Sequence, residues 1–451
     1  MESDGNFPEP FEIQSYDDLL QFPNIPASTI DIPSGNRAIT EPIIDAIVVP
    51  TFRTAERLRP AAQFAAAARC HLIVVYTDNL PPGLSYVLEG LRPAQVTLLT
   101  VRTGSKDRLL DLGASLPQSR VSPAASDISR KRNLGLLLGR MCGWTRMLFL
   151  DDDIRKLNVA KLSSAAALLD NYPVVGLQVK KYPDASVVGH ARRLTGRRQE
   201  PFVSGGSLLV NPQLLNGYFA PIYHEDWLCL INHLRKGEVA IGGSVGQLPY
   251  LPFTTPERAR LEEFGEVLLS GLLWLVHART RKGADEIGPA ALSEYWREAT
   301  NPRFWKQILE QRAELLTDIT TGLTGKRFDG PSPLPSLAGA KDRLAELKPA
   351  DFVRFTEAWL ASLAEWRSRL SALAEIDLPD KGRAIEKALA KLGLAHVVRV
   401  HEPFDQQASA RGIRLRAGFA DRLARWAGAD GRRRFRVGNW LLARVRRADR
   451  R

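Results

Sequence analysis

A short apolar run that ends in three consecutive aspartates places the strongest constraint on how this chain folds. Residues 147–150 read MLFL, and Asp151, Asp152 and Asp153 follow directly. Four apolar residues in a row are typical of a buried strand in a parallel sheet, whereas an unpaired buried carboxylate costs several kcal/mol. The acids therefore belong at the carboxyl end of the strand, where open α/β sheets bind ligands. They suit Mg²⁺ or Mn²⁺, although an acidic turn that caps the next helix would have the same sequence.

Apolar strand-like segments and helical patterns alternate before this motif. Residues 44–49, 71–76 and 96–101 are apolar and separated by helical patterns. Such alternation predicts a parallel sheet with right-handed crossovers. We therefore expect an α/β domain over residues 41–284.

The two ends of the chain have a different character. Residues 1–40 are rich in Pro, Ser, Asn and Asp and predict an N-terminal arm without a secretory signal. Long helical patterns separated by Pro and Gly predict a helical domain over residues 285–451.

The most apolar window, 268–278, is too short to span a bilayer, so we expect a buried helix there.

Composition indicates a globular protein of a reducing compartment. Of the 451 residues, 44% are hydrophobic and 25% charged, as in soluble domains. The three cysteines have no CxxC spacing, which argues against a zinc site or a disulfide framework. We therefore expect a cytoplasmic location.

The positive charge is concentrated at the C-terminus. Residues 409–451 contain fourteen arginines and three aspartates, which is nearly all of the net charge of +12. Residues 435–451 form an amphipathic pattern with Trp440 on the apolar face. This pattern is typical of a helix on an anionic membrane surface, which would place the protein at the inner face of the membrane. A final helix packed on the helical domain, with a solvated arginine face, is the alternative.

Polar signals occur in a fixed order along the α/β half. Basic residues at 130–132 open a predicted helix, where a bound anion or a solvated turn would explain them. Gly189 to Arg193 is predicted to be a polar loop or hairpin, and two glycines interrupt the strand-like segment 202–210, which indicates close approach of a ligand or another backbone. The motifs, in chain order, are Pro50 with Thr51, Asp78, Arg132 with Asn133, Asp151 to Asp153, Gly205 with Gly206, and Glu225 with Asp226.

This order of motifs resembles that of GT-A glycosyltransferases, most closely family 2 and its relatives, over roughly residues 41–280. The resemblance implies a GT-A type fold, a Rossmann-like sheet domain that transfers sugars from nucleotide-diphospho-sugars, here followed by a C-terminal helical domain. It implies that Asp151 and Asp153 hold Mn²⁺ or Mg²⁺, with His277 as a third ligand unless that histidine is a core residue. The implied substrate-binding residues are Pro50, Thr51, Asp78, Arg132, Asn133, Asp151, Asp152, Gly205 and Gly206.

The resemblance also assigns the chemistry. Asp226 would take the proton from the acceptor hydroxyl, with Glu225 as the second choice, and Arg132, Arg192 or Arg193 would help on phosphate. The Gln-x-x-Arg-Trp segment of processive synthases is absent. We therefore expect transfer of a single sugar from a nucleotide-sugar donor to an unidentified acceptor, with inversion, although a retaining mechanism stays open.

Other functions remain as alternatives. A nucleotidylyltransferase would carry a Gly-rich loop after the first strand, where this chain has PTFRTAERLR. A haloacid dehalogenase phosphatase would place its Asp-x-Asp on the first core strand. A non-catalytic GT-A-like protein could bind an anionic surface or nucleic acid through the arginine tail, but nucleic acid is not expected because aromatic residues are sparse there.

Overall fold

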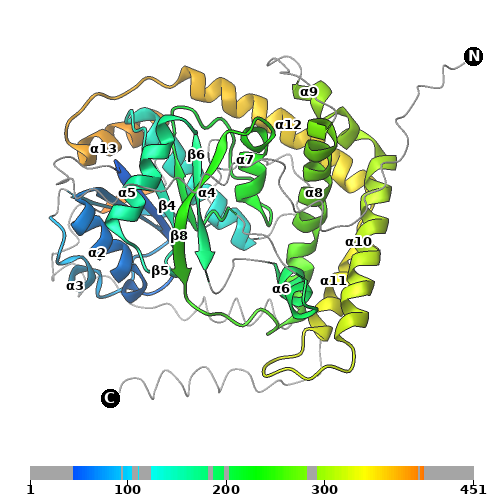
Figure 1. Cartoon of the computed structure of the whole chain (residues 1–451). Coiled ribbons are helices and arrows are strands. Elements are labelled where there is room, and N and C mark those ends of the chain that lie inside the picture. Colours follow the sequence, from blue (N-terminus) through cyan, green and yellow to red (C-terminus); the bar gives the residue numbers. More distant parts are fainter. Residues whose placement is uncertain are drawn as a thin grey trace, which may run out of the picture. The chain divides into compact units, whose positions relative to one another are not determined.

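The computed structural model describes residues 44–92, 95–103, 110, 123–180, 186–197, 203–281, 292–394 and 397–400 (Figure 1). The predicted arm at residues 1–40 and the arginine-rich tail lie outside the described residues, so the interpretations attached to them stay predictions.

The described strands form one mixed sheet. Its nine strands are ordered β5-β8-β6-β7-β4-β1-β2-β3-β9. The strands are β1 (Ala46–Thr51), β2 (His71–Thr77), β3 (Val96–Val101), β4 (Met147–Leu150), β5 (Ile154–Arg155), β6 (Val174–Lys180), β7 (Ser207–Val210), β8 (Val239–Gln247) and β9 (Val397–Val400).

The predicted parallel arrangement is confirmed for the first four strands of the chain. β1 pairs in parallel with both β2 and β4, and β2 with β3. β7 instead runs antiparallel between β4 and β6, and β9 runs antiparallel to β3. The protein is therefore an α/β protein with a mixed sheet, as the alternating segments predict in outline.

Strand register determines which residues meet at the carboxyl edge. Val48 of β1 lies opposite Phe149 of β4 in the parallel ladder. Continuing the same offset brings Thr51 level with Asp152 beyond the last paired residues. The segment after β1 and the aspartates after β4 are thus neighbours because of this pairing.

Helices cover the sheet and continue beyond it. The helical elements are η1 (Ala55–Leu58), α2 (Arg59–Ala68), α3 (Leu84–Leu88), α4 (Pro123–Met141), α5 (Val159–Ala167), η4 (Leu168–Asp170), α6 (Val187–Leu194), α7 (Glu225–Arg235), α8 (Pro256–Arg281), α9 (Leu292–Tyr295), η6 (Arg297–Thr300), α10 (Pro302–Leu323), α11 (Leu334–Glu346), α12 (Pro349–Ala372) and α13 (Lys381–Leu392). Side-chain caps explain several starts. Asn158, Asn301 and Asp380 each accept a backbone N–H from the first turn of the helix that follows.

The loop predicted over Gly189 to Arg193 is wrong, because these residues belong to α6. Ser186 caps the helix by accepting the Gly189 N–H at 2.9 Å. Val187, Val188 and Ala191 are buried on one face. The apolar face of α6 is short and is flanked by polar residues, so the sequence shows no clear helical periodicity there.

The C-terminal helices pack on α8. Figure 1 shows α8, α10 and α11 side by side, and the three helices contact one another. Phe352 of α12 stacks on Phe264 of α8, with 4.8 Å between the ring centroids. Trp366, also of α12, donates through Nε1 to the Gly217 carbonyl at 2.8 Å. The helices beyond residue 285 therefore share a hydrophobic core with α8 and with the segment that leads to α7.

The long apolar window predicted to be a buried helix lies within α8, and its leucines are buried. None of the helices in the described part of the chain combines the length and apolar character that crossing a bilayer requires.

Candidate functional site

A cavity of about 510 Å³ lies at the edge of the sheet where β1 and β4 end. Its walls come from the segment after β1, the three aspartates after β4, α4, the segment leading into α7, and the first half of α8. Of the predicted site residues, the lining includes Pro50, Thr51, Asp151, Asp152, Asp153 and Glu225. Residues from three separate motifs therefore face one space.

Asp152, the middle aspartate, is bound to the last residue of β1 and to the segment that follows it. Its carboxylate accepts from Thr51 Oγ1 at 2.5 Å and from Arg53 Nη1 at 2.7 Å. Arg53 Nη1 also lies 3.7 Å from an oxygen of Asp153. Asp152 is nearly buried, whereas Arg53 is 40% exposed at the cavity. Asp152 therefore joins the two strand ends, and Arg53 presents a positive charge to any ligand.

Arg132 of α4 is a fully buried cation between two motifs. Its guanidinium donates to Asp151 at 2.9 Å and to Glu225 at 2.5 Å, and it lies over the Phe219 ring. Burial alone would lower the pKa of Arg132, but the nearby carboxylates of Asp151, Glu225 and Asp226 raise it. Arg132 is therefore permanently charged and links the end of β4 to the start of α7.

The two acids at the start of α7 have different surroundings. Asp226 accepts the Gly205 N–H at 2.7 Å with one oxygen and the Trp227 N–H at 2.8 Å with the other. Glu225 lines the cavity. Burial raises the pKa of Glu225, and the adjacent carboxylate of Asp226 adds to that rise against the opposing charge of Arg132. Glu225 is thus the acid of this pair that faces the cavity.

Gly205 and Gly206 are required by close side-chain contacts. A Cβ at Gly205 would lie 2.7 Å from Arg132 Nη1 and 2.8 Å from Asp226 Cβ. At Gly206 it would lie 3.0 Å from Asp151 Oδ2. The predicted close approach exists at these glycines, but the neighbours are charged side chains of the site rather than another backbone.

Asp153 has the environment of a cation ligand. Its Oδ1 atom is buried and has no hydrogen-bond partner in the described part of the chain, and Gln247 lies 3.3 Å from Oδ2. Burial, followed by the charge of Asp151, raises the pKa of Asp153. A positive ion beside Oδ1 would offset both effects.

The arrangement fits an ion that is shared with a substrate. Across the described residues, no group of three His, Cys, Asp or Glu side chains is arranged to hold a metal on its own. Mg²⁺ often needs only one or two carboxylates, because it takes its remaining oxygens from water and substrate phosphates. Asp151 and Asp153 are the pair that fits this pattern, while Asp152 is already bound to Thr51 and Arg53.

Seven predicted site residues do not line the cavity. Arg132, Gly205, Gly206 and Asp226 contact one another or the lining acids, whereas Asp78, Asn133 and His277 have other surroundings. Asp78 is exposed and accepts two hydrogen bonds from Thr103, each of 2.6 Å. Asn133 exchanges two hydrogen bonds with the backbone of Phe219, at 2.8 and 2.9 Å. His277 follows Glu262 by fifteen residues on α8, which is roughly 22 Å along a helix. The structure thus gives Asp78 and Asn133 local structural partners and places His277 far along α8 from Glu262.

The sequence does not single out Arg258 or Glu262, and it indicates Lys131 only as part of the basic run at 130–132. Lys131 is buried and donates to the Thr51 carbonyl at 2.8 Å and to Asp127 at 2.6 Å, and burial lowers its pKa. Arg258 donates to Glu262 at 2.7 Å, and both line the cavity. The spacing of four residues between Arg258 and Glu262 was a usable signal, because it places the pair on one helix face.

Comparison with protein-family models and with curated proteins finds no match to this chain. The chemistry of the site is therefore the basis for a functional proposal.

Proposed function

We propose that this protein is a metal-dependent glycosyltransferase that moves a single sugar from a nucleotide-diphosphate sugar to an acceptor hydroxyl with inversion. The observation that carries the proposal is that Thr51, Asp151, Asp153 and Glu225, from three separate motifs, line one cavity at the carboxyl edge of the sheet. A GT-A type fold belongs to the same proposal, and the α/β sheet is compatible with it.

The donor diphosphate would lie at the aspartate end of the cavity. Asp151 and Asp153 would hold Mn²⁺ or Mg²⁺, and the unpartnered Oδ1 of Asp153 supports this assignment. When bound, the ion offsets the negative charge that develops on the leaving diphosphate. Arg53, half-exposed at the cavity and already close to Asp152 and Asp153, can bind a phosphate oxygen.

Glu225 is the better placed general base. It lines the cavity, whereas both oxygens of Asp226 accept backbone N–H groups. Burial raises the pKa of Glu225 and makes its carboxylate a stronger base, while contact with Arg132 opposes that rise and favours the ionised form that can take the acceptor proton. In this proposal Glu225 takes the proton, and Asp226 fixes the Gly205 backbone. This reverses the order of preference that the resemblance implies.

Thermal stabilisation tests the proposal directly. The purified protein would be heated with a panel of nucleoside diphosphates and nucleotide-sugars, with Mn²⁺ or with a chelator. A ligand at about a hundred times its dissociation constant adds ~2.7 kcal/mol to the folded state. We expect stabilisation by one nucleotide only with Mn²⁺, and its loss in Asp153→Ala.

The matched control is Asp170→Ala, because Asp170 is an exposed aspartate paired with Arg146. This variant should respond to nucleotide as the wild type does. Absence of any response in the wild type would reject the transferase proposal in favour of a non-catalytic domain. Incubation of the responding donor with candidate acceptors would then identify the transfer.

A further inference from the structure

Helix α8 carries three glutamates on the side that packs against the rest of the protein: Glu262 and Glu263 are buried, and Glu266 is largely buried. Glu262 pairs with Arg258, and Glu263 pairs with Arg312 of α10 through two hydrogen bonds of 2.7 and 2.8 Å. Glu266 differs because it contacts two cationic side chains. A buried charge needs a partner, so three in one helix indicate a specific arrangement.

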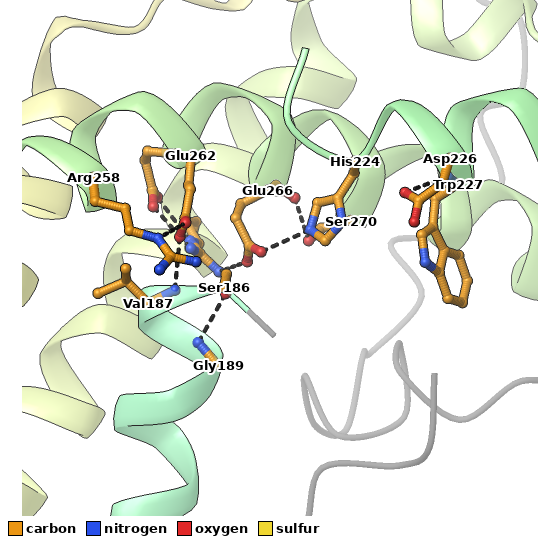
Figure 2. Close-up of polar contacts among 12 residues, drawn as sticks. Ser186, Val187, Gly189, His224, Asp226, Trp227, Arg258, Glu262, Glu266 and Ser270 are labelled. Carbon is orange, nitrogen blue, oxygen red and sulfur yellow. Dashed lines mark hydrogen bonds and ion pairs between the residues drawn. The ribbon is translucent and has the colours of Figure 1, made fainter. Parts of the chain in front are cut away.

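Glu266 joins three other elements of the fold. Its Oε1 lies 2.8 Å from His224 Nε2, and its Oε2 lies 3.1 Å from Arg312 Nη1. Ser186, the residue that caps α6, also hydrogen-bonds to this carboxylate. Figure 2 shows Glu266 between Ser186 and His224. Elements that are distant in sequence are therefore connected through one side chain.

The surroundings of His224 and Glu266 favour the charged form of both side chains. Burial would raise the pKa of Glu266, but Arg312 and His224 lower it to about 2. Burial would lower the pKa of His224, but the hydrogen bond that His224 donates to Glu266 raises it, as do the charges of Glu266, Asp226 and Glu225. The contact is thus a buried ion pair with Arg312 as the second cation on Glu266.

His224 directly precedes the acids of the cavity. It is the residue before α7, with a left-handed φ of 68°, and Glu225 is the first helical residue. A non-glycine residue in this conformation needs support from its surroundings. The ion pair with Glu266 supplies that support, and the ring of Tyr223, a cavity residue, packs on His224 at 4.2 Å.

We propose that Arg312, Glu266 and His224 form a positioning relay that fixes the first turn of α7, so that the helices beyond residue 285 hold Glu225 in its orientation toward the cavity. This inference rests on the proposed function and gives the C-terminal helices a role in it. Among the described residues, the cavity lining includes none of the three relay members. They are positioning residues and touch no reacting group.

The substitution His224→Asn tests the relay. Asparagine tolerates the left-handed conformation, but its side chain is too short to reach Glu266. His233→Asn is the matched control, because His233 is a buried histidine at the other end of α7 that contacts Glu238 at 2.7 Å. We expect His224→Asn to lower kcat at least tenfold with the donor KM changed less than twofold. His233→Asn should leave kcat within twofold of wild type.

Equal losses of kcat in the two variants, or a full kcat in His224→Asn, would overturn the relay. His224→Lys keeps a cation near Glu266 and should retain more kcat than His224→Leu, because both side chains meet the same strain from the left-handed backbone at this position. If the substitution acted only by destabilising the fold, kcat would not depend on whether the side chain at position 224 carries a positive charge.

Hydrogen exchange gives a readout that does not depend on sugar transfer. Backbone amides over residues 225–230 should exchange at least tenfold faster in His224→Asn and in Arg312→Lys, which alters α10 rather than α7. His233→Asn should speed exchange only at the other end of α7. Unchanged exchange over residues 225–230 in both relay variants would reject the relay even if the transferase activity is found. Faster exchange would support it even if the activity is not.

Discussion

Arg132 of α4 and Glu225 of α7 form a buried ion pair with 2.5 Å between Nη1 and Oε1. The same guanidinium contacts Asp151, and Asp226 contributes a third carboxylate to its surroundings. One cation therefore balances three acids from the end of β4 and the start of α7. Burial is the main reason why the pKa of Glu225 is raised although an arginine is in contact with it, and the neighbouring carboxylates of Asp226 and Asp151 add to the rise.

Replacing Arg132 with methionine should destabilise the protein strongly. The change leaves the carboxylates of Asp151 and Glu225 without their cation, and an unpaired buried charge costs about 3–5 kcal/mol. Urea unfolding at pH 7 measures the loss. Adding Glu225→Gln to Arg132→Met should recover part of it, because one of the acids is then neutral.

The control for this change is Arg146→Met, which removes a surface ion pair with Asp170. Exposed pairs contribute about 0–1 kcal/mol, so this variant should stay close to wild type. Similar losses in Arg132→Met and Arg146→Met would mean that Arg132 stabilises the fold through packing alone.

The two acids of α7 should respond differently to amide substitution. Glu225→Gln removes the proposed base and should lower kcat by ~10²–10⁴, with nucleotide binding retained. Asp226→Asn disturbs the hydrogen bond to Gly205 N and should raise the rate of unfolding more than it lowers kcat. Steady-state kinetics and unfolding rates of both variants separate the roles. A larger kcat loss in Asp226→Asn would restore Asp226 as the base.

The sequence is enough to predict that the aspartates lie at the carboxyl edge of the sheet, but it does not predict which side chains they contact there. The apolar run before Asp151 and the alternation of segments were enough to place the aspartates at a strand end. The contact between Thr51 and Asp152 depends on the pairing of β1 with β4, which joins residues 101 positions apart. No local pattern encodes that pairing, because strand register is set by the packing of whole elements.

Some contacts of the site residues also have no local signal. Asp78 is predicted to bind substrate, and in the structure its carboxylate accepts the N–H and hydroxyl of a neighbouring loop residue, Thr103. The substrate role of Asp78 stays a prediction. The charges of α8 were missed because Glu263 finds its partner, Arg312, 49 positions further along the chain. The sequence around a buried glutamate does not differ from that around an exposed one, so only the position of its partner in the fold identifies it as buried.

Gly205 should not tolerate a methyl group. In Gly205→Ala the new Cβ would meet Arg132 Nη1 and Asp226 Cβ at 2.7 and 2.8 Å, so the buried pair must shift. Overpacking of this kind costs about 1–3 kcal/mol, and the displaced acids should lower kcat as well. Gly90→Ala is the control, because a Cβ there meets nothing within 4 Å. Calorimetry and kinetics check both, and an unchanged Gly205→Ala would contradict the tight contact.

Glu262 should make the stability of the protein depend on pH. Burial raises its pKa from the ordinary 4.5 to about 7, against the opposing effects of Arg258 and the Val187 N–H. The folded state therefore holds this proton more tightly than the unfolded state does. The resulting stabilisation is complete below pH 4.5 and is lost as the pH rises through 7, a change of about 3 kcal/mol.

Glu262→Gln isolates this contribution, because glutamine resembles the protonated carboxyl group at every pH. The free energy of unfolding of the wild type, minus that of the variant, should fall by about 3 kcal/mol between pH 4.5 and pH 8. Other raised groups, such as Glu225 and Asp153, titrate in both proteins and cancel in this difference. Glu257→Gln changes an exposed residue of the same helix and should give a difference that is nearly independent of pH. If the difference for Glu262→Gln is also independent of pH, then Glu262 is ionised in the folded protein across this pH range. In that case Arg258 stabilises the ionised carboxylate, and the cavity carries one more negative charge than the burial of Glu262 implies.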